Sequence, residues 1–249
     1  MNDGEDILGI LGGMGPHATA YFFQTLLNMV PARTDQQYPR ILIDCHSAIP
    51  DRTRAILGQG PSPVPAMLDS ARRLAVAGVR WVVMPCITAH FFLPEVRRQA
   101  AVDFVDLLEE TARWLDERQY QHVGVLTTTG SRESGIFQRY FQRFYLTFPP
   151  ADLQENSVMA AIYGERGAKS GDLREAASLL APAVDRLITA RPQVLLMGCT
   201  EIPLILRSER VGVPLVDPMV IGAAAALQRM GVPAVEIRWG AAGWAEVKP

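Results

Sequence analysis

Two segments of the chain, residues 79–90 and 194–203, share a pattern that strongly constrains the fold. In each, a run of apolar, β-forming residues stops at a turn-forming residue, and a cysteine follows with a threonine just beyond it. Pro85 cannot donate to a sheet ladder, so a strand should end there and a helix should begin near Cys86. The N–H groups of that helix would favour a thiolate. The pattern predicts α/β units in which Cys86 and Cys199 lie at strand ends.

A second pair of segments recurs at almost the same spacing. Residues 9–12, a strand that runs into a glycine loop, resemble residues 124–127, which lie 115 positions later, and the two cysteines are 113 positions apart. Because two different features, a strand with its loop and a cysteine, recur after nearly the same number of residues, the sequence predicts two pseudo-symmetric, three-layer α/β domains with parallel sheets. Functional groups of parallel sheets gather at the carboxyl ends of the strands. We therefore expect an active-site cleft between the domains, with one thiol on either side.

We assign residues 1–101 and about 212–249 to the first domain, and residues 102–211 to the second. The chain is 49% hydrophobic and 20% charged, which is enough apolar material for a core. The net charge of −2 argues against a nucleic-acid surface or a basic membrane surface, and no apolar run reaches the roughly 18 residues of a membrane span. The acidic start and three cysteines outside any metal-ligand spacing predict a cytoplasmic protein without a metal.

Hydrophobic spacing and turn residues place the remaining elements. Residues 58–65 and 148–171 show no regular pattern, and the tail from Gly231 permits no firm assignment. We expect strands that begin at residue 7 and lie at 40–44, 122–126 and 211–216, and helices at about 18–29, 66–77, 94–99, 103–116, 133–144, 173–190 and 219–230.

Several loops are candidates for binding a small anion. Residues 12–15 expose backbone N–H groups before a helix; the G-x-G-x-x-G dinucleotide fingerprint is absent, and a tight turn without a ligand is the alternative. Arg52 lies in a polar, proline-anchored loop after the second strand, where it can bind an anion or cap a carbonyl. The hydroxyls of 127–131 suit a carboxylate or phosphate, and they also suit capping of the next helix. Residues 163–171 form a flexible, positively charged stretch.

The three cysteines admit several interpretations. Cys45 belongs to no recurring pattern, and we expect it to be inert packing. A disulfide between Cys86 and Cys199 needs Cα atoms within about 7 Å, which a cleft that holds substrate would prevent. A single nucleophile with His90 as its base, one helical turn after Cys86, remains open. Two thiols across a cleft suit removal of a proton from one face of a carbon and its return to the other. Such chemistry needs no cofactor, but the carbanion-like state needs nearby N–H groups and hydroxyls.

These motifs together resemble the aspartate/glutamate racemase superfamily, closest to its aspartate racemase branch. The resemblance extends in order over residues 7–230. It implies paired α/β domains, usually dimeric, that act without pyridoxal phosphate or metal on a small carboxylate substrate. The motifs that carry it are Gly-Gly-Met-Gly-Pro at 12–16, Ile-Pro-Asp-Arg-Thr at 49–53, Pro-Cys at 85–86 with Thr-Ala-His at 88–90, Thr-Thr-Gly at 128–130 and Gly-Cys-Thr-Glu at 198–201.

Carried over residue by residue, the resemblance makes Cys86 and Cys199 the two acid/base thiols. Arg52 and Lys169 become candidates for holding the distal carboxylate of the substrate. The remaining residues predicted to bind substrate are Met14, Gly15, Ile87, Thr88, Thr128, Thr129 and Thr200, of which Thr88, Thr128 and Thr200 would hold the α-carboxylate or the amino group.

One residue departs from the superfamily pattern. Asparagine usually follows the first cysteine, and this chain has Ile87 there. Isoleucine cannot hydrogen-bond, so we expect a drier pocket in which the Cys86 thiol is harder to ionise and the substrate is less certainly free aspartate. We expect a racemase of an acidic amino acid such as aspartate or glutamate. The alternatives are a cofactor-independent decarboxylase or isomerase of the same superfamily, and a non-catalytic ligand-binding homologue.

Overall fold

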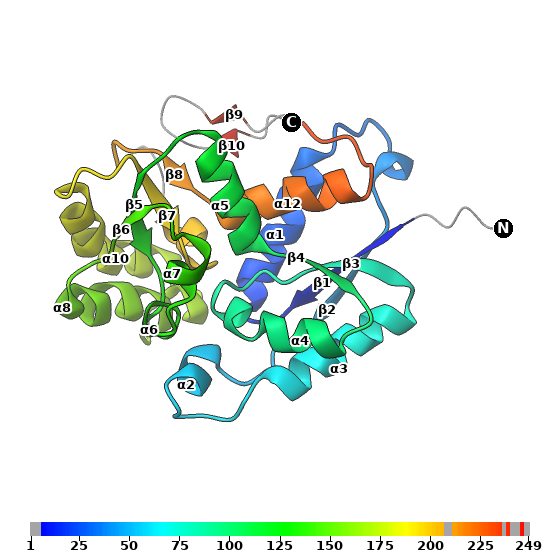
Figure 1. The fold of residues 1–249 in the computed structure, drawn as a ribbon, viewed down its shortest axis with the longest axis horizontal. Helices are drawn as coiled ribbons and strands as arrows, with labels where there is room; N and C mark the ends of the chain where they lie inside the picture. The colour runs from blue at the N-terminus through cyan, green and yellow to red at the C-terminus, as the bar shows by residue number, and fades with distance from the viewer. Residues whose placement is uncertain (1–5, 207–210, 236–237, 240–244, 247–249) are drawn as a thin grey trace.

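The computed structural model describes residues 6–206, 211–235, 238–239 and 245–246, and these contain two parallel four-stranded sheets (Figure 1). The first sheet has the order β2-β1-β3-β4 and the second β6-β5-β7-β8, so one strand order occurs twice. The predicted α/β fold with paired parallel sheets is confirmed. The strands are β1 (Ile7–Gly12), β2 (Ile41–Cys45), β3 (Val79–Val83), β4 (Asp103–Val105), β5 (His122–Leu126), β6 (Tyr145–Thr147), β7 (Val194–Met197) and β8 (Leu215–Val216).

Helices occupy the connections between the strands and cover both faces of each sheet. A short antiparallel pair, β9 (Arg238–Trp239) and β10 (Ala245–Glu246), lies near the end of the chain. The helices are α1 (Pro16–Met29), η1 (Asp35–Gln37), α2 (Arg52–Ile56), α3 (Val64–Val76), η2 (Thr88–Phe91), α4 (Leu93–Gln99), α5 (Leu107–Glu117), α6 (Thr129–Glu133), α7 (Ile136–Tyr140), α8 (Ala151–Leu153), the π-helix η3 (Gln154–Met159), α9 (Ala160–Tyr163), η4 (Ala168–Ser170), α10 (Leu173–Ile188), α11 (Ile202–Ile205) and α12 (Pro218–Arg229).

Each sheet is the middle layer of three. Buried side chains of α3 and α4 pack on one face of the first sheet, and those of α1 and α12 pack on the other. In Figure 1 these two pairs of helices lie below and above the first sheet. In the second half, α10 covers one face and α5 and α7 the other. All strands run parallel within each sheet, so the loops that follow them emerge along one edge.

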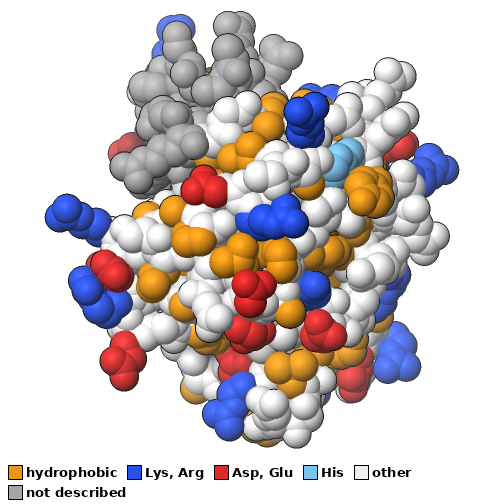
Figure 2. Space-filling model, turned by 90° about the vertical axis from the view of Figure 1, so that its left-hand side faces the viewer, with side chains coloured by type: hydrophobic (Ala, Val, Ile, Leu, Met, Phe, Trp, Pro, Cys, Tyr) orange, Lys and Arg blue, Asp and Glu red, His pale blue; other side chains and the backbone are white. Residues whose placement is uncertain are grey.

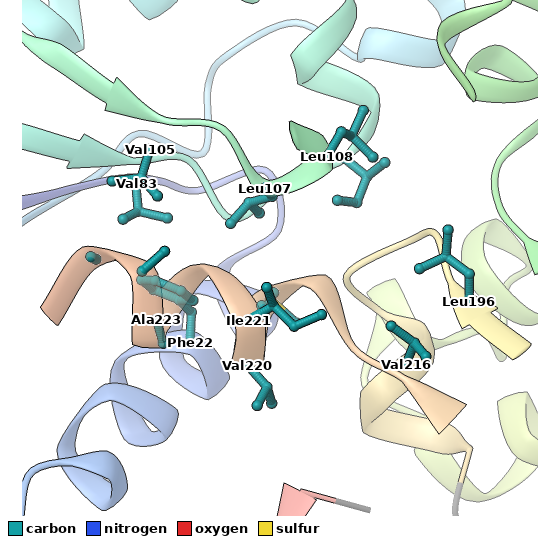
Figure 3. Close-up of a cluster of buried hydrophobic side chains, with 14 of the residues drawn as sticks. Phe22, Val83, Val105, Leu107, Leu108, Leu196, Val216, Val220, Ile221 and Ala223 are labelled. Carbon is teal, nitrogen blue, oxygen red and sulfur yellow. The ribbon is translucent and has the colours of Figure 1, made fainter. Parts of the chain in front are cut away.

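The last helix joins the two halves. Asp217 caps α12, because its carboxylate accepts the N–H of Met219 at 2.8 Å. The apolar residues of α12 lie between strands of the first sheet and strands of the second, so one core extends across both (Figure 3). At Gly222 a Cβ atom would lie 2.0 Å from the Leu107 side chain, so the absence of a side chain lets α12 approach α5.

The sheets suggest where the chain crosses between domains. Strand β4 pairs with β3 of the first sheet, and β8 pairs with β7 of the second. Because α12 packs on α1, residues after β8 return to the first half. We propose a two-domain division with crossings just after β4 and just after β8, a few residues later than the limits of 101/102 and 211/212 expected from sequence.

Several predicted elements differ in the structure. Of the helix expected at 103–116, the first three residues form strand β4 instead, and the helix itself, α5, begins at Leu107. Asp106 separates the two elements, because its carboxylate caps α5 by accepting the N–H groups of Leu108 and Glu109. The helix expected at 133–144 is interrupted at Gly135, whose φ of 69° is left-handed, and β6 follows. Residues 148–171, expected to be irregular, are largely helical. The helix expected near residue 86 begins later, as η2 followed by α4, and the strand expected at 211–216 is limited to β8.

The surface carries charges of both signs. On the face shown in Figure 2, lysine and arginine side chains lie among aspartate and glutamate side chains. Among the residues that the structure describes, no helix is long and apolar enough to cross a membrane.

Candidate active site

A cavity of about 280 Å³ lies between the two halves. The loops that follow β1 and β2 form its wall on the first-sheet side, and η4 and the loop after β7 form the opposite wall. All three loops leave the carboxyl ends of parallel strands, as expected for the functional edge of such sheets. The charged side chains that line the cavity are Asp51, Arg52, Lys169 and Glu201.

The glycine loop after β1 needs glycine for close approach. Gly13 has φ of 90°, and a Cβ atom there would lie 2.4 Å from the carbonyl carbon of His46, so the loops after β1 and β2 touch through their backbones. A Cβ atom at Gly15 would lie 3.1 Å from the Glu201 carboxylate. The loop therefore brings main chain, rather than side chain, to the cavity.

Arg52 is the first residue of α2, and it is buried despite its charge, at 6% exposure. Its guanidinium donates to the carbonyl oxygens of Met14 at 2.8 Å, Pro50 at 2.9 Å and Ile49 at 3.2 Å. The Nε atom is also buried, and it has no hydrogen-bond partner. Arg52 thus fixes two cavity loops against each other.

Cys86 lies just beyond β3, at 5% exposure. Burial alone would lower the pKa of Arg52, but Cys86, followed by Tyr163 and Asp51, raises it above its usual value, and Cys86 contributes both through charge and through a hydrogen bond. The thiol therefore lies beside a guanidinium, which is the partner that a thiolate needs.

The His90 side chain contacts the backbone carbonyl of Cys86 and not the Cys86 thiol. The backbone N–H of Leu107 donates to Nε2 at 3.1 Å, so Nδ1 carries the proton and donates to the Cys86 carbonyl at 2.8 Å. Complete burial lowers the pKa of His90, which favours the neutral ring. Both ring nitrogens are engaged by the backbone, so His90 is not placed to act as the base of a Cys86 nucleophile.

Cys199 lies beyond β7, at 4% exposure, and its surroundings differ from those of Cys86. Its thiol donates to Glu201 Oε2 at 3.1 Å, and Lys169 Nζ donates to Glu201 Oε1 at 2.6 Å. Burial, followed by the charge of Glu201, raises the pKa of Cys199 well above its usual value, against an opposing effect of Lys169.

Lys169 relates the two thiols electrostatically. Burial would lower the pKa of its ammonium, but Glu201, Cys199 and Cys86 each raise it, with a net upward shift. A negative charge on either cysteine would therefore interact with the same ammonium group. The two thiols predicted from sequence lie near one cation, on opposite sides of the boundary between the halves.

Three hydroxyls from both halves form a buried ring. Thr88 Oγ1 lies 3.0 Å from Thr128 Oγ1, and both lie within 3.0 Å of Ser131 Oγ. Thr128 also caps α6, because it accepts the N–H of Ser131. Thr200 is likewise buried, and its hydroxyl donates to Glu201 at 3.2 Å. The hydroxyls of Thr88, Thr128 and Thr200 are the ones that the family resemblance assigns to the α-carboxylate or the amino group of the substrate.

Of the residues predicted to bind substrate, only Gly15, Arg52 and Lys169 line the cavity; the three threonines at 88, 128 and 200 and the two thiols lie outside its lining, and three further residues lie farther from it. The Met14 side chain is buried in the first-half core, and its carbonyl accepts from Arg52. Thr129 faces the outer side of α6, where its hydroxyl donates to Glu155. Ile87 is 1% exposed and packs into the core shared by the two halves. Their roles in substrate binding remain predictions.

Three residues at or beside the cavity are not among those that the sequence analysis predicts for the site: Glu201, Tyr163 and Asp51. Glu201 belongs to the Gly-Cys-Thr-Glu motif, but the motif does not reveal its contact with Cys199, two positions earlier. Tyr163 Oη donates to Asp51 Oδ2 at 2.9 Å and so links the two halves at the cavity, yet no local sequence pattern predicts this pair.

Among the described residues, no three His, Cys, Asp or Glu side chains gather in a way that could hold a metal ion.

Comparison with known proteins agrees with this geometry. The structure of aspartate racemase from Picrophilus torridus is 28% identical and superposes with a TM-score of 0.83, over 92% of this chain and 96% of that one. Glutamate racemase from Francisella tularensis, in complex with D-glutamate, shares the fold at 16% identity, with a TM-score of 0.66 over 91% of this chain and 81% of that one. The broad specificity amino-acid racemase RacX of Bacillus subtilis is 24% identical over 218 residues, 85% of this chain and 92% of that protein. The model of the Asp/Glu/hydantoin racemase family matches residues 11–226, and the chain therefore belongs to this family.

Proposed function

We propose that this protein is an amino-acid racemase in which Cys86 and Cys199 act on opposite faces of the α-carbon. The observation that carries the proposal is the presence of two buried thiols at matching strand ends, each with a charged neighbour that lines one cavity: Arg52 for Cys86 and Glu201 for Cys199. A lone packed cysteine needs no such neighbour. The cysteine pair also distinguishes this chemistry from a decarboxylase or isomerase that would use one thiol.

The reaction balances with the two thiols alone. A Cys86 thiolate takes the α-proton from one face, and the Cys199 thiol gives its proton to the opposite face; the other enantiomer reverses these roles. The negative charge that develops on the substrate carboxylate and α-carbon requires preorganised donors. The buried hydroxyls of Thr88 and Thr128 and the N–H groups of the glycine loop at 12–15 are suitable donors.

For the substrate we propose an acidic amino acid such as aspartate or glutamate. Arg52 and Lys169 are the cations of the cavity, and they suit a distal carboxylate. The terminal nitrogens of Arg52 already donate to backbone carbonyls, and Lys169 is paired with Glu201. A distal carboxylate would therefore share Lys169 with Glu201.

One observation favours a second substrate class. Apart from His17, the titratable groups of the cavity lining are two cations, Arg52 and Lys169, and two carboxylates, Asp51 and Glu201, whose charges balance. A zwitterionic amino acid with an uncharged side chain matches such a lining, and the similarity to a broad specificity amino-acid racemase supports this candidate.

The experiment is a panel of single enantiomers, including aspartate, glutamate and neutral amino acids, incubated with the protein and analysed by chiral chromatography. We expect racemisation of an acidic member, or of neutral members if the second substrate class applies. Cys45→Ser should racemise like the wild type, because Cys45 is exposed, whereas Cys86 and Cys199 are buried beside the lining residues Arg52 and Glu201. Binding without racemisation of any member would instead identify a non-catalytic homologue.

The assembly and cellular location complete the proposal. As the family resemblance implies, we propose that the protein is a homodimer, and we place it in the cytoplasm. Sedimentation equilibrium of the purified chain tests the dimer, since a single species at the 27.4 kDa monomer mass would contradict it.

A further inference from the structure

Glu201 is almost completely buried, at 3% exposure, and both of its carboxylate oxygens accept hydrogen bonds. Oε1 accepts from Lys169 Nζ at 2.6 Å. Oε2 accepts the thiol hydrogen of Cys199 at 3.1 Å and the hydroxyl hydrogen of Thr200 at 3.2 Å. A buried carboxylate that accepts three hydrogen bonds has a fixed orientation, and here that orientation presents one oxygen to a thiol.

The two thiols therefore have neighbours of opposite charge. Cys86 lies beside the Arg52 guanidinium, and Cys199 donates to the Glu201 carboxylate. The other titratable groups that influence Cys199 electrostatically are Lys169, which is held by Glu201, and Tyr163. A carboxylate opposes loss of the thiol proton, whereas a guanidinium favours a thiolate.

We infer that Glu201 is the positioning residue of Cys199: it orients the thiol and keeps it protonated, so that in the free protein Cys199 is the acid of the pair and Cys86 the base. This inference rests on the two-thiol racemase proposed above. In the first turnover, Cys86 takes the α-proton and Cys199 gives up its own, which leaves a Cys199 thiolate beside Glu201. Before another turnover in the same direction, Cys199 regains a proton from solvent and Cys86 releases the proton that it took. In the reverse reaction, the Cys199 thiolate takes the α-proton of the opposite enantiomer and Cys86 returns its proton to the carbon.

Lys169 has a defined part in this arrangement. Once Cys199 has given up its proton, two anions lie next to each other, and Lys169 is the cation that contacts Glu201. Its ammonium limits the repulsion between them, so Cys199 can act in both directions of the reaction. Glu201 and Lys169 should consequently shift the ionisation of Cys199 in opposite senses.

The test follows the ionisation of Cys199 directly. In the Cys45→Ser/Cys86→Ser variant Cys199 is the single remaining cysteine of the three, so labelling with [3-13C]cysteine gives one Cβ resonance whose shift reports thiol or thiolate. Between pH 6 and 11 we expect its midpoint to lie above that of an ordinary cysteine. Adding Glu201→Gln should lower the midpoint by at least one pH unit, a tenfold gain in thiolate at a given pH. Glu175→Gln, which removes a carboxylate on α10 instead, should leave it unchanged.

A midpoint that is unchanged or raised by Glu201→Gln would overturn the inference. If that variant does not fold, Lys169→Gln decides, because it should raise the midpoint, and a lowered or unchanged value overturns the inference equally. The measurement needs no turnover, so its failure is separable from failure of the proposed function, which the enantiomer panel tests. In the otherwise wild-type chain, Glu201→Gln should also move the decline of kcat at high pH to lower pH by about the same interval. If the pH at which kcat declines does not change, Glu201 has a purely structural role.

Discussion

At Arg52 one side chain holds the fold at the cavity and is also the proposed partner of a substrate carboxylate. Its guanidinium joins the carbonyls of Met14 and Pro50, and a lysine ammonium cannot reach these acceptors in the same planar geometry. We expect Arg52→Lys to lower kcat/KM for a dicarboxylate substrate by about 10- to 100-fold, which corresponds to about 1.5–3 kcal/mol for hydrogen bonds to a charged group. Steady-state kinetics on aspartate checks this, and unchanged kcat/KM would make the arginine purely structural.

Ile87 shows how burial changes the meaning of a substitution. The sequence suggests that Ile87→Asn would improve activity on free aspartate, and this remains a prediction for the chiral assay. The structure adds a prediction about stability, since Ile87 is buried in the shared core and an amide there has no evident partner. We expect Ile87→Asn to lower the free energy of unfolding by about 1–3 kcal/mol. Ile87→Val is the matched control, at about 0.5–1.5 kcal/mol, and urea unfolding measures both. Equal losses in the two variants would show that the amide finds partners.

At the scale of the element, the cap of α12 gives the protein a pH-dependent stability. Burial raises the pKa of Asp217 to about 6, against the opposing effects of its hydrogen bonds from Met219 and Tyr21. Between pH 4 and 6 the folded state then holds a proton that the unfolded state has lost. The Asp217 contribution therefore makes stability fall as pH rises through this window and level off above it.

Asp217→Asn should remove this pH dependence while keeping an oxygen to cap the helix. We expect the variant to be more stable than the wild type at pH 7, by at most about 3 kcal/mol, and equal to it near pH 4. Thermal unfolding of both proteins across pH 4–7 measures the difference. The same slope in both would assign the pH dependence to other groups.

The elements that sequence predicts well are those with a long, regular pattern. The helix α10 and the strand β7 have uniform apolar spacing and lie within two residues of the expected limits. The short strands β4 and β6, of three residues each, were missed, because their strand character comes from pairing with a neighbour rather than from local pattern. The helical stretch around the π-helix η3 was missed for a similar reason: it is formed by packing against α10.

At the scale of the whole molecule, the two halves pack against each other where α2 meets α6. A Cβ atom at Gly130 would lie 2.7 Å from the Thr53 Cα atom, which belongs to the opposite half. Gly130→Ala should push these helices apart, lower Tm by several degrees and reduce kcat/KM by about tenfold or more. Glu133→Ala, an exposed change on the same helix, is the control for a local effect on α6. Wild-type kinetics in Gly130→Ala would show that this contact does not set the geometry of the site.

The site was predictable to the extent that it lies at strand ends. Cys86, Cys199 and Arg52 each follow a strand that the sequence identifies, and parallel strands bring such positions to one edge. The contacts between the halves were not predictable, because Ser131 and Tyr163 reach the site only through the placement of one sheet against the other. The burial of Ile87 likewise depends on the shared core rather than on its neighbours in sequence.

The two-thiol mechanism is tested most directly by the fate of solvent deuterium. We expect that, early in the reaction of one enantiomer in D₂O, NMR and mass spectrometry find deuterium at the α-carbon of the product enantiomer and almost none in the recovered substrate, since different thiols remove and return the proton. Cys86→Ser and Cys199→Ser should each abolish racemisation, because a serine hydroxyl is a far weaker acid and base at these positions. Equal deuterium in substrate and product from the first turnovers, or substantial racemisation by either serine variant, would contradict a mechanism with one thiol on each face.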